Sequence, residues 1–128
     1  MKSITLVLLL AAPVAAFAHH SFTAAYDSTK RVEVEGVVKE FLWRNPHSFV
    51  RIEVTAKDGA VETWNLEWGS TNQLQATKYP VTRTTLKAGD RIVASGEPGR
   101  DPAVKRIRIT ANVSFVPDVL QTRDLLDV

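Results

Sequence analysis

Apolar and polar residues alternate along five segments of the chain, and a period of two is typical of β-strands that bury one face. In the clearest segment, Val50, Ile52 and Val54 lie on one side, with Arg51 and Glu53 between them. The alternation predicts strands at residues 31–43, 48–56, 61–68, 91–96 and 104–115.

Glycine and proline interrupt these strands at three points. Gly36 lies in the middle of the first strand, where a glycine indicates a bend or a β-bulge. Asn45-Pro46 predicts a corner before the second strand, because proline withholds a backbone donor and keeps the preceding residue extended. Asp58-Gly59 is typical of the tight turn of a hairpin, so the second and third strands are expected to pair.

One short helix is predicted between the third and fourth strands. Ser70 can accept hydrogen bonds from the free amides of a first helical turn, and the helix would continue to Thr77. Three strands, a helix and two more strands is the order of a five-stranded Greek-key barrel of the OB type. We therefore predict an all-β fold with little helix. A sandwich of two sheets with an incidental helix is the alternative.

The two ends of the chain lack the alternation. Residues 1–18 contain an early lysine, an apolar stretch and Ala16-Phe17-Ala18, a combination typical of an export signal and its cleavage site. The apolar stretch is shorter than the roughly 20 residues that span a membrane. We predict a signal peptide at 1–18, one barrel domain at 19–116 and a C-terminal tail at 117–128. The mature protein is expected to be periplasmic or secreted and free of the membrane.

The composition narrows the chemistry that the protein can perform. There is no cysteine, so an exported form has no disulfide framework and depends on packing for stability. The only methionine is Met1, so the mature chain has no sulfur ligand. Removal of Lys2 with the leader leaves 15 basic and 14 acidic residues, a balance that calls for no polyanionic partner.

The three histidines are the most distinctive chemical groups in the sequence. Cleavage after residue 18 would make His19 the first residue, with a free α-amino group whose ordinary pKa is near 8. That amine and the Nδ1 atom of the same residue can chelate one metal ion. His20 and His47 are the only other imidazoles. A set of nitrogen ligands favours Cu(II) among divalent ions, ahead of Ni(II) and Zn(II), and suits Cu(I) poorly without sulfur.

Two further residues are candidates for supporting such a site. Glu67 would accept a hydrogen bond from a ligating imidazole, or ligate the metal itself, if the third strand runs beside the corner. Asn45 is a second candidate for the supporting role. The alternative is that the new terminus is a frayed polar end and that His47 only satisfies a backbone carbonyl at the turn.

Several motifs resemble those of a family of small exported bacterial proteins of unknown function. They are His19-His20-Ser21-Phe22, Trp43-Arg44-Asn45-Pro46-His47, Trp64-Asn65-Leu66-Glu67 with Gly69-Ser70, and Leu86-Lys87-Ala88-Gly89-Asp90. The resemblance covers nearly all of the mature chain and implies export and a compact β-rich domain, but no activity. The loop Gly99-Arg100-Asp101-Pro102 departs from the Asp-Gly that is common in the family.

These observations predict an exported small binding protein that holds a transition metal through His19 and His47. The alternative is a non-catalytic OB-type module, without metal, for an unknown protein or small-molecule partner. We expect no enzyme, because no nucleophile elbow, paired carboxylates or phosphate loop is present; a copper-dependent oxidation is the enzymatic alternative left open. Nucleic acid is not expected as a partner, since acidic residues share the surface with Arg51, Arg106 and Arg108.

Overall fold

The computed structural model describes residues 22–117, which contain five strands and two short helices. The predicted leader, His19, His20 and the tail beyond Pro117 lie outside the described residues. In chain order the elements are α1 (Phe22–Ala25), β1 (Val32–Leu42), β2 (Phe49–Thr55), β3 (Val61–Glu67), α2 (Thr71–Gln75), β4 (Arg91–Pro98) and β5 (Arg106–Phe115). Within this part of the chain, no helix is long and apolar enough to cross a membrane.

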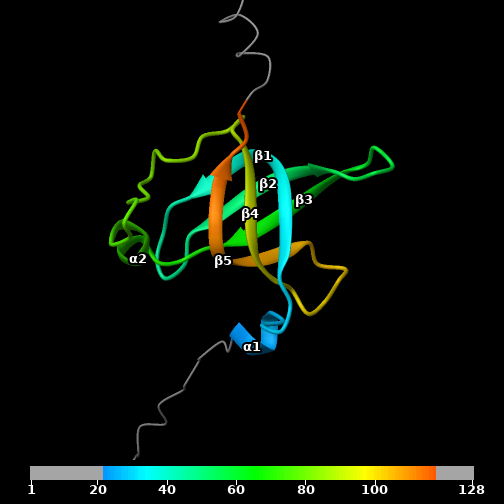
Figure 1. Cartoon of the computed structure of the whole chain (residues 1–128), viewed down its shortest axis with the longest axis horizontal. Helices are drawn as coiled ribbons and strands as arrows, with labels where there is room; N and C mark the ends of the chain where they lie inside the picture. Colours follow the sequence, from blue (N-terminus) through cyan, green and yellow to red (C-terminus); the bar gives the residue numbers. More distant parts are fainter. Residues whose placement is uncertain (1–21, 118–128) are drawn as a thin grey trace, which may run out of the picture.

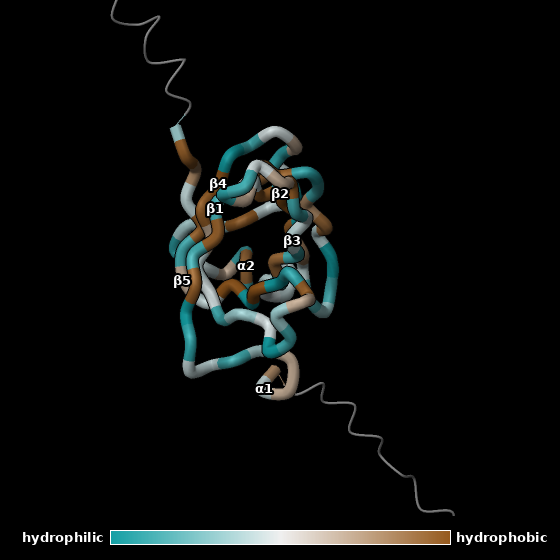
Figure 2. The backbone as a smooth tube through the Cα atoms, turned by 90° about the vertical axis from the view of Figure 1, so that its right-hand side faces the viewer, coloured by the Kyte–Doolittle hydropathy of each residue, from teal (hydrophilic) through white to brown (hydrophobic). Residues whose placement is uncertain are grey.

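The five strands form one closed barrel in the order β1-β2-β3-β5-β4, with β4 pairing back onto β1. All neighbouring strands are antiparallel except β3 and β5, which run parallel. α2 lies at one end of the barrel, and α1 lies below the strands (Figure 1). Figure 2 looks through the ring of strands toward α2 at its far end. This topology is the predicted OB-like Greek-key barrel, and its closure excludes the two-sheet sandwich.

Alternation places the apolar side chains of each strand inside the barrel. The central side chains are completely buried, and they come from all five strands: Val38, Val50, Ile52, Leu66, Ile92, Ala94 and Ile107. Brown, hydrophobic positions recur along the strands in Figure 2, separated by hydrophilic ones. The solvent-facing side of the strands therefore carries the polar side chains, including those of the candidate site.

The bulge in β1 lies beyond the glycine that was expected to mark it. The pairing between β1 and β2 shifts between Val38 and Glu40, whereas Gly36 pairs regularly with Ile92. Gly36 is needed for a different reason: a Cβ atom there would lie 2.5 Å from the Glu53 carbonyl oxygen and 2.9 Å from the Ile52 Cδ1. The glycine therefore allows β1 and β2 to approach closely at this point.

The helices differ from the sequence prediction in length and in number. α2 begins after Ser70, as predicted, and a reciprocal capping box joins Ser70 and Gln73. The helix ends at Gln75, two residues earlier than predicted. α1 was not predicted, because four residues without a capping motif give no helical pattern.

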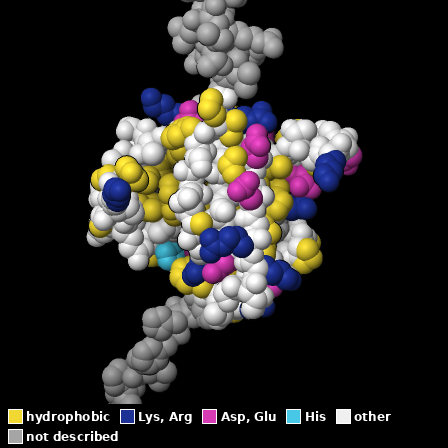
Figure 3. Space-filling view, in the orientation of Figure 1, with side chains coloured by type: hydrophobic (Ala, Val, Ile, Leu, Met, Phe, Trp, Pro, Cys, Tyr) yellow, Lys and Arg dark blue, Asp and Glu magenta, His cyan; other side chains and the backbone are white. Residues whose placement is uncertain are grey.

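An apolar groove separates the segment after α2 from the end of β5. It has a volume of about 440 Å³ and is lined by Leu74, Val81, Leu86 and Phe115, among others. Figure 3 shows hydrophobic side chains gathered on the side of the barrel that carries α2. Tyr79 and Phe115 remain largely exposed beside this groove.

Candidate functional site

The outer face of β2, β3 and β5 carries two aligned rows of side chains. Strand register places Arg51, Asn65 and Arg106 in one row and Phe49, Glu67 and Arg108 in the next. β3 lies between β2 and β5, so Arg51 and Arg106 share a row although their strands do not pair directly.

The corner between β1 and β2 brings His47 to the end of the second row. The Asn45–Pro46 peptide bond in this corner is cis. Ser48 is completely buried, its amide donates to the Gly69 carbonyl at 3.0 Å, and its own carbonyl accepts from the Trp68 amide at 2.8 Å. These two backbone hydrogen bonds hold the corner beside the end of β3, where Glu67 lies.

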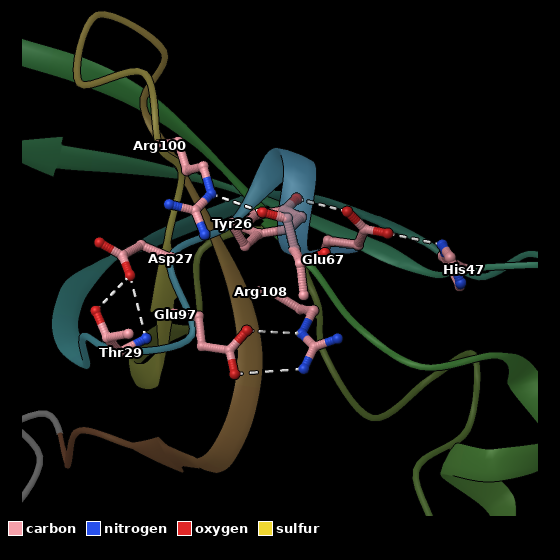
Figure 4. Close-up of polar contacts among 9 residues, drawn as sticks. Tyr26, Asp27, Thr29, His47, Glu67, Glu97, Arg100 and Arg108 are labelled. Atoms are coloured by element: carbon pink, nitrogen blue, oxygen red, sulfur yellow. Dashed lines mark hydrogen bonds and ion pairs between the residues drawn. The ribbon is translucent and has the colours of Figure 1, made fainter. Parts of the chain in front are cut away.

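Glu67 joins His47 to Tyr26 (Figure 4). The Nδ1 atom of His47 lies 2.6 Å from Glu67 Oε1, and the Tyr26 hydroxyl donates to Glu67 Oε2 at 2.5 Å. Because an ionised carboxylate only accepts hydrogen bonds, the ring proton of a neutral His47 belongs on Nδ1. The carboxylate therefore leaves Nε2 of His47 as the nitrogen with a free lone pair.

The Phe22 ring packs against the His47 ring. The two ring centroids are 5.1 Å apart, and the guanidinium of Arg108 lies 4.4 Å above the Phe22 ring. Arg108 forms an ion pair with Glu97, with Nε 3.2 Å from Oε2. The Nε–H does not point well enough at that carboxylate to form a hydrogen bond. α1 is thus fixed against the barrel by an aromatic and cationic stack next to His47.

The structure brings together only some of the predicted site residues. His47 and Glu67 are in contact. The Asn45 side-chain oxygen instead accepts from the amide and hydroxyl of Thr71, at 3.0 and 2.9 Å, at the start of α2. The roles of Asn45 and Glu67 behind a metal ligand stay predictions, and so does every ligand role of His19, His20 and His47. Residues 22–117 contain no group of three metal-binding side chains.

Two contributors to the site, Tyr26 and Phe22, were missed by sequence reasoning. Phe22 belongs to the His-His-Ser-Phe motif, so its position directly after two histidines was the available signal. Tyr26 reaches Glu67 across 41 residues of sequence. No local pattern indicates a contact over that separation.

Burial, together with the hydrogen bond to Glu67, raises the pKa of Tyr26 well above its usual range. The chain has two tyrosines, so Tyr79→Phe leaves Tyr26 as the only phenol. We expect Tyr26 of the folded variant to remain un-ionised at about pH 10, where a free tyrosine is half-ionised. The unfolded chain releases this proton more readily, so this group lowers the stability as pH rises above about 10. Ultraviolet absorbance of tyrosinate measures the titration, and half-ionisation near pH 10 in the folded protein would refute the assignment.

The sequence matches a family described as "Family of unknown function (DUF6152)" over residues 7–108. The chain belongs to this family. Membership in DUF6152 confirms the expected family of unknown function and assigns no activity; the export signal and the individual motifs stay predictions. No curated protein matches the sequence.

Three solved structures are similar to this DUF6152 protein in shape. The mitochondrial single-stranded DNA-binding protein Rim1 of S. cerevisiae is 10% identical, with a TM-score of 0.48 over 70% of this chain and 96% of that chain. The N-terminal domain of PriB from Thermoanaerobacter tencongensis is 16% identical, with a TM-score of 0.46 over 70% and 99%. The yeast Stn1 and Ten1 structure is 15% identical, with a TM-score of 0.46 over 75% and 48%. The OB-like assignment rests on the strand order of this barrel and not on these distant matches.

Proposed function

We propose that this protein is an exported, periplasmic or secreted binding protein that holds one transition-metal ion, Cu(II) in the first place. The ligands are Nε2 of His47 and the amine and ring of His19, exposed when residues 1–18 are removed. His20 is the further imidazole at the same terminus. The observation that carries the proposal is the 2.6 Å contact between His47 Nδ1 and Glu67.

A histidine that binds a metal usually gives its other ring N–H to a carboxylate or a carbonyl, which fixes the ring and makes it a better ligand. Glu67 has this relation to His47, and Tyr26 in turn holds Glu67 from the opposite side. In Figure 4 the second ring nitrogen of His47 points away from Glu67. The His47 side chain is 35% exposed, so the ring is partly open to solution.

The position of Phe22 supports a contribution from the new terminus. Its ring lies against His47, and His19 is three residues earlier in the chain. Three residues span at most about 10 Å when fully extended. The amine and imidazole of His19 are therefore within reach of an ion bound to His47. All the donors named are nitrogens, and the divalent series places Cu(II) above Ni(II) and Zn(II) for such a set.

The test is isothermal titration of the processed, metal-free protein with Cu(II). One equivalent is expected to bind tightly. Glu67→Gln should weaken this binding by roughly 10- to 100-fold, because it removes the support of a ligand. His47→Ala removes the ligand itself and is expected to cost more than about 100-fold. Lys87→Ala, an exposed substitution in the turn before β4, is the control and should leave the affinity unchanged.

A second candidate is a binding module that needs no metal. This second candidate is favoured by a hollow on the outer face of β2, β3 and β5. The hollow is lined by arginines and is open to solvent. The titration separates the two candidates: copper affinity that is weak and unchanged in His47→Ala would reject the metal proposal and leave the barrel face as the site.

A further inference from the structure

A hollow of about 360 Å³ lies beside the His47–Glu67 pair, on the outer face of the barrel. The corner after β1, strands β2 and β3, and the start of β5 with its preceding loop contribute its walls. Its charged lining consists of three arginines and one glutamate: Arg44, Arg51, Arg106 and Glu67. Three guanidiniums outnumber the single carboxylate, whose two oxygens are engaged by Tyr26 and His47, so the charged lining is net positive.

Two of these arginines, Arg44 and Arg106, form no ion pair with an acidic residue within residues 22–117. Arg106 lies 5.2 Å over the Tyr26 ring and donates from Nη2 to the Ala25 carbonyl at a long 3.4 Å. Its Nε atom is buried and lacks a hydrogen-bond partner among the described residues. Because this atom is closed to solvent, an anion in the hollow would bind the terminal nitrogens of the Arg106 guanidinium instead. Arg51 differs, because its Nη1 is paired with Glu40 at 2.9 Å.

The rest of the lining is apolar and aromatic. Leu42, Phe49 and Val104 form this part of the wall. The Arg44 guanidinium lies over the Phe49 ring, 5.1 Å from its centre. This cation–π contact holds Arg44 beside the apolar part of the wall. A pocket that combines apolar walls with a few convergent polar groups is typical of small-molecule sites.

The charges around the hollow argue against a long polyanion. Arg51 is paired with Glu40 at 2.9 Å. Glu53 follows two residues later on the same face of β2 and is paired with Lys39 at 3.1 Å. A nucleic acid strand needs a continuous basic path for its phosphates, and the surface here alternates in sign.

We infer that this hollow binds a small organic anion that has one carboxylate or phosphate group and a flat apolar body. A guanidinium presents paired N–H donors that match the oxygens of either head group. Arg106 and Arg44 bind the head group, while Phe49 and its apolar neighbours contact the body. The inference does not depend on copper, since the arginines and the ring are placed without any ion.

The experiment uses the processed, metal-free protein and follows backbone and Arg106 Nε–H resonances by NMR. The probes are phenyl phosphate, benzoate, inorganic phosphate and a single-stranded oligonucleotide. Phenyl phosphate or benzoate should shift the Arg106 Nε–H and Phe49 signals with a saturable isotherm. Arg44→Glu should weaken that binding by about 10-fold or more, because it replaces a charged donor with a repelling carboxylate. Arg83→Glu makes the same charge change on an exposed residue outside the hollow and should have no such effect.

Other results overturn the inference. Absence of saturable shifts with both aromatic anions would show that the hollow is not an anion site. Equal losses in Arg44→Glu and Arg83→Glu would show that only the overall charge matters. Inorganic phosphate binding as tightly as phenyl phosphate would remove the role of the apolar wall. Tighter binding of the oligonucleotide would assign the face to a polymer instead. Each readout is independent of the copper titration.

Discussion

A processed chain with three extra residues ahead of His19 is expected to bind Cu(II) more than about 100-fold more weakly than the chain that starts at His19, a loss larger than that from removing a supporting group. The extra residues convert the His19 amine into an amide and move the new α-amino group away from the His19 ring. An amide nitrogen holds its proton far more strongly than an α-amino group, whose pKa is near 8 and which gives up its proton to a metal readily. The chelate formed by amine and ring would then be lost. Titration with Cu(II) under identical conditions measures the difference.

The matched control adds three residues at the other end, after Val128. This addition changes length and mass in the same way and leaves the amine free. It should bind copper as the unmodified chain does. If the N-terminally extended protein bound equally well, the terminus would be irrelevant and His47 would act with other groups or not at all.

Gly96→Ala is expected to lower the free energy of unfolding by about 3 kcal/mol. Gly96 is buried in β4, next to the point where the pairing between β4 and β5 shifts register. A Cβ atom there would collide with the carbonyl group of Arg108 and lie 3.0 Å from the Ile109 Cα. All these atoms belong to backbone, so β5 itself would have to move. Urea unfolding followed by tryptophan fluorescence measures the loss.

Gly69→Ala is the comparison for this effect. The atom nearest to a Cβ at position 69 is the Gln73 side-chain oxygen, at 3.2 Å, and the end of a flexible side chain can move away. The cost should therefore be clearly smaller than that of Gly96→Ala. Equal destabilisation of both variants would show that the close approach of β4 to β5 does not limit stability.

The barrel could be predicted from the sequence because its main signal is local. Alternation with a period of two shows directly which side chains enter the core, and all five predicted strands are present within a few residues of their expected ends. The Asp58-Gly59 turn also determines the register of β2 against β3, because each residue before the turn pairs with one after it. That register places Phe49 opposite Glu67, and His47 follows from it as a neighbour of Glu67.

Features that depend on contacts between distant segments were not predictable in the same way. The bulge in β1 lies between Val38 and Glu40, and nothing in the local residues distinguishes that place from Gly36. The Tyr26–Glu67 hydrogen bond requires α1 to pack under the barrel, a position that the alternation of the strands does not determine. The unpartnered Nε of Arg106 is likewise visible only when the side chains around it are placed.

Native mass spectrometry of protein taken from the exported fraction of copper-supplemented cells tests the metal proposal most directly. The proposal predicts a chain of residues 19–128 that carries one copper ion and loses it in His47→Ala. A chain that begins at another residue, or one that is metal-free under these conditions, would contradict it.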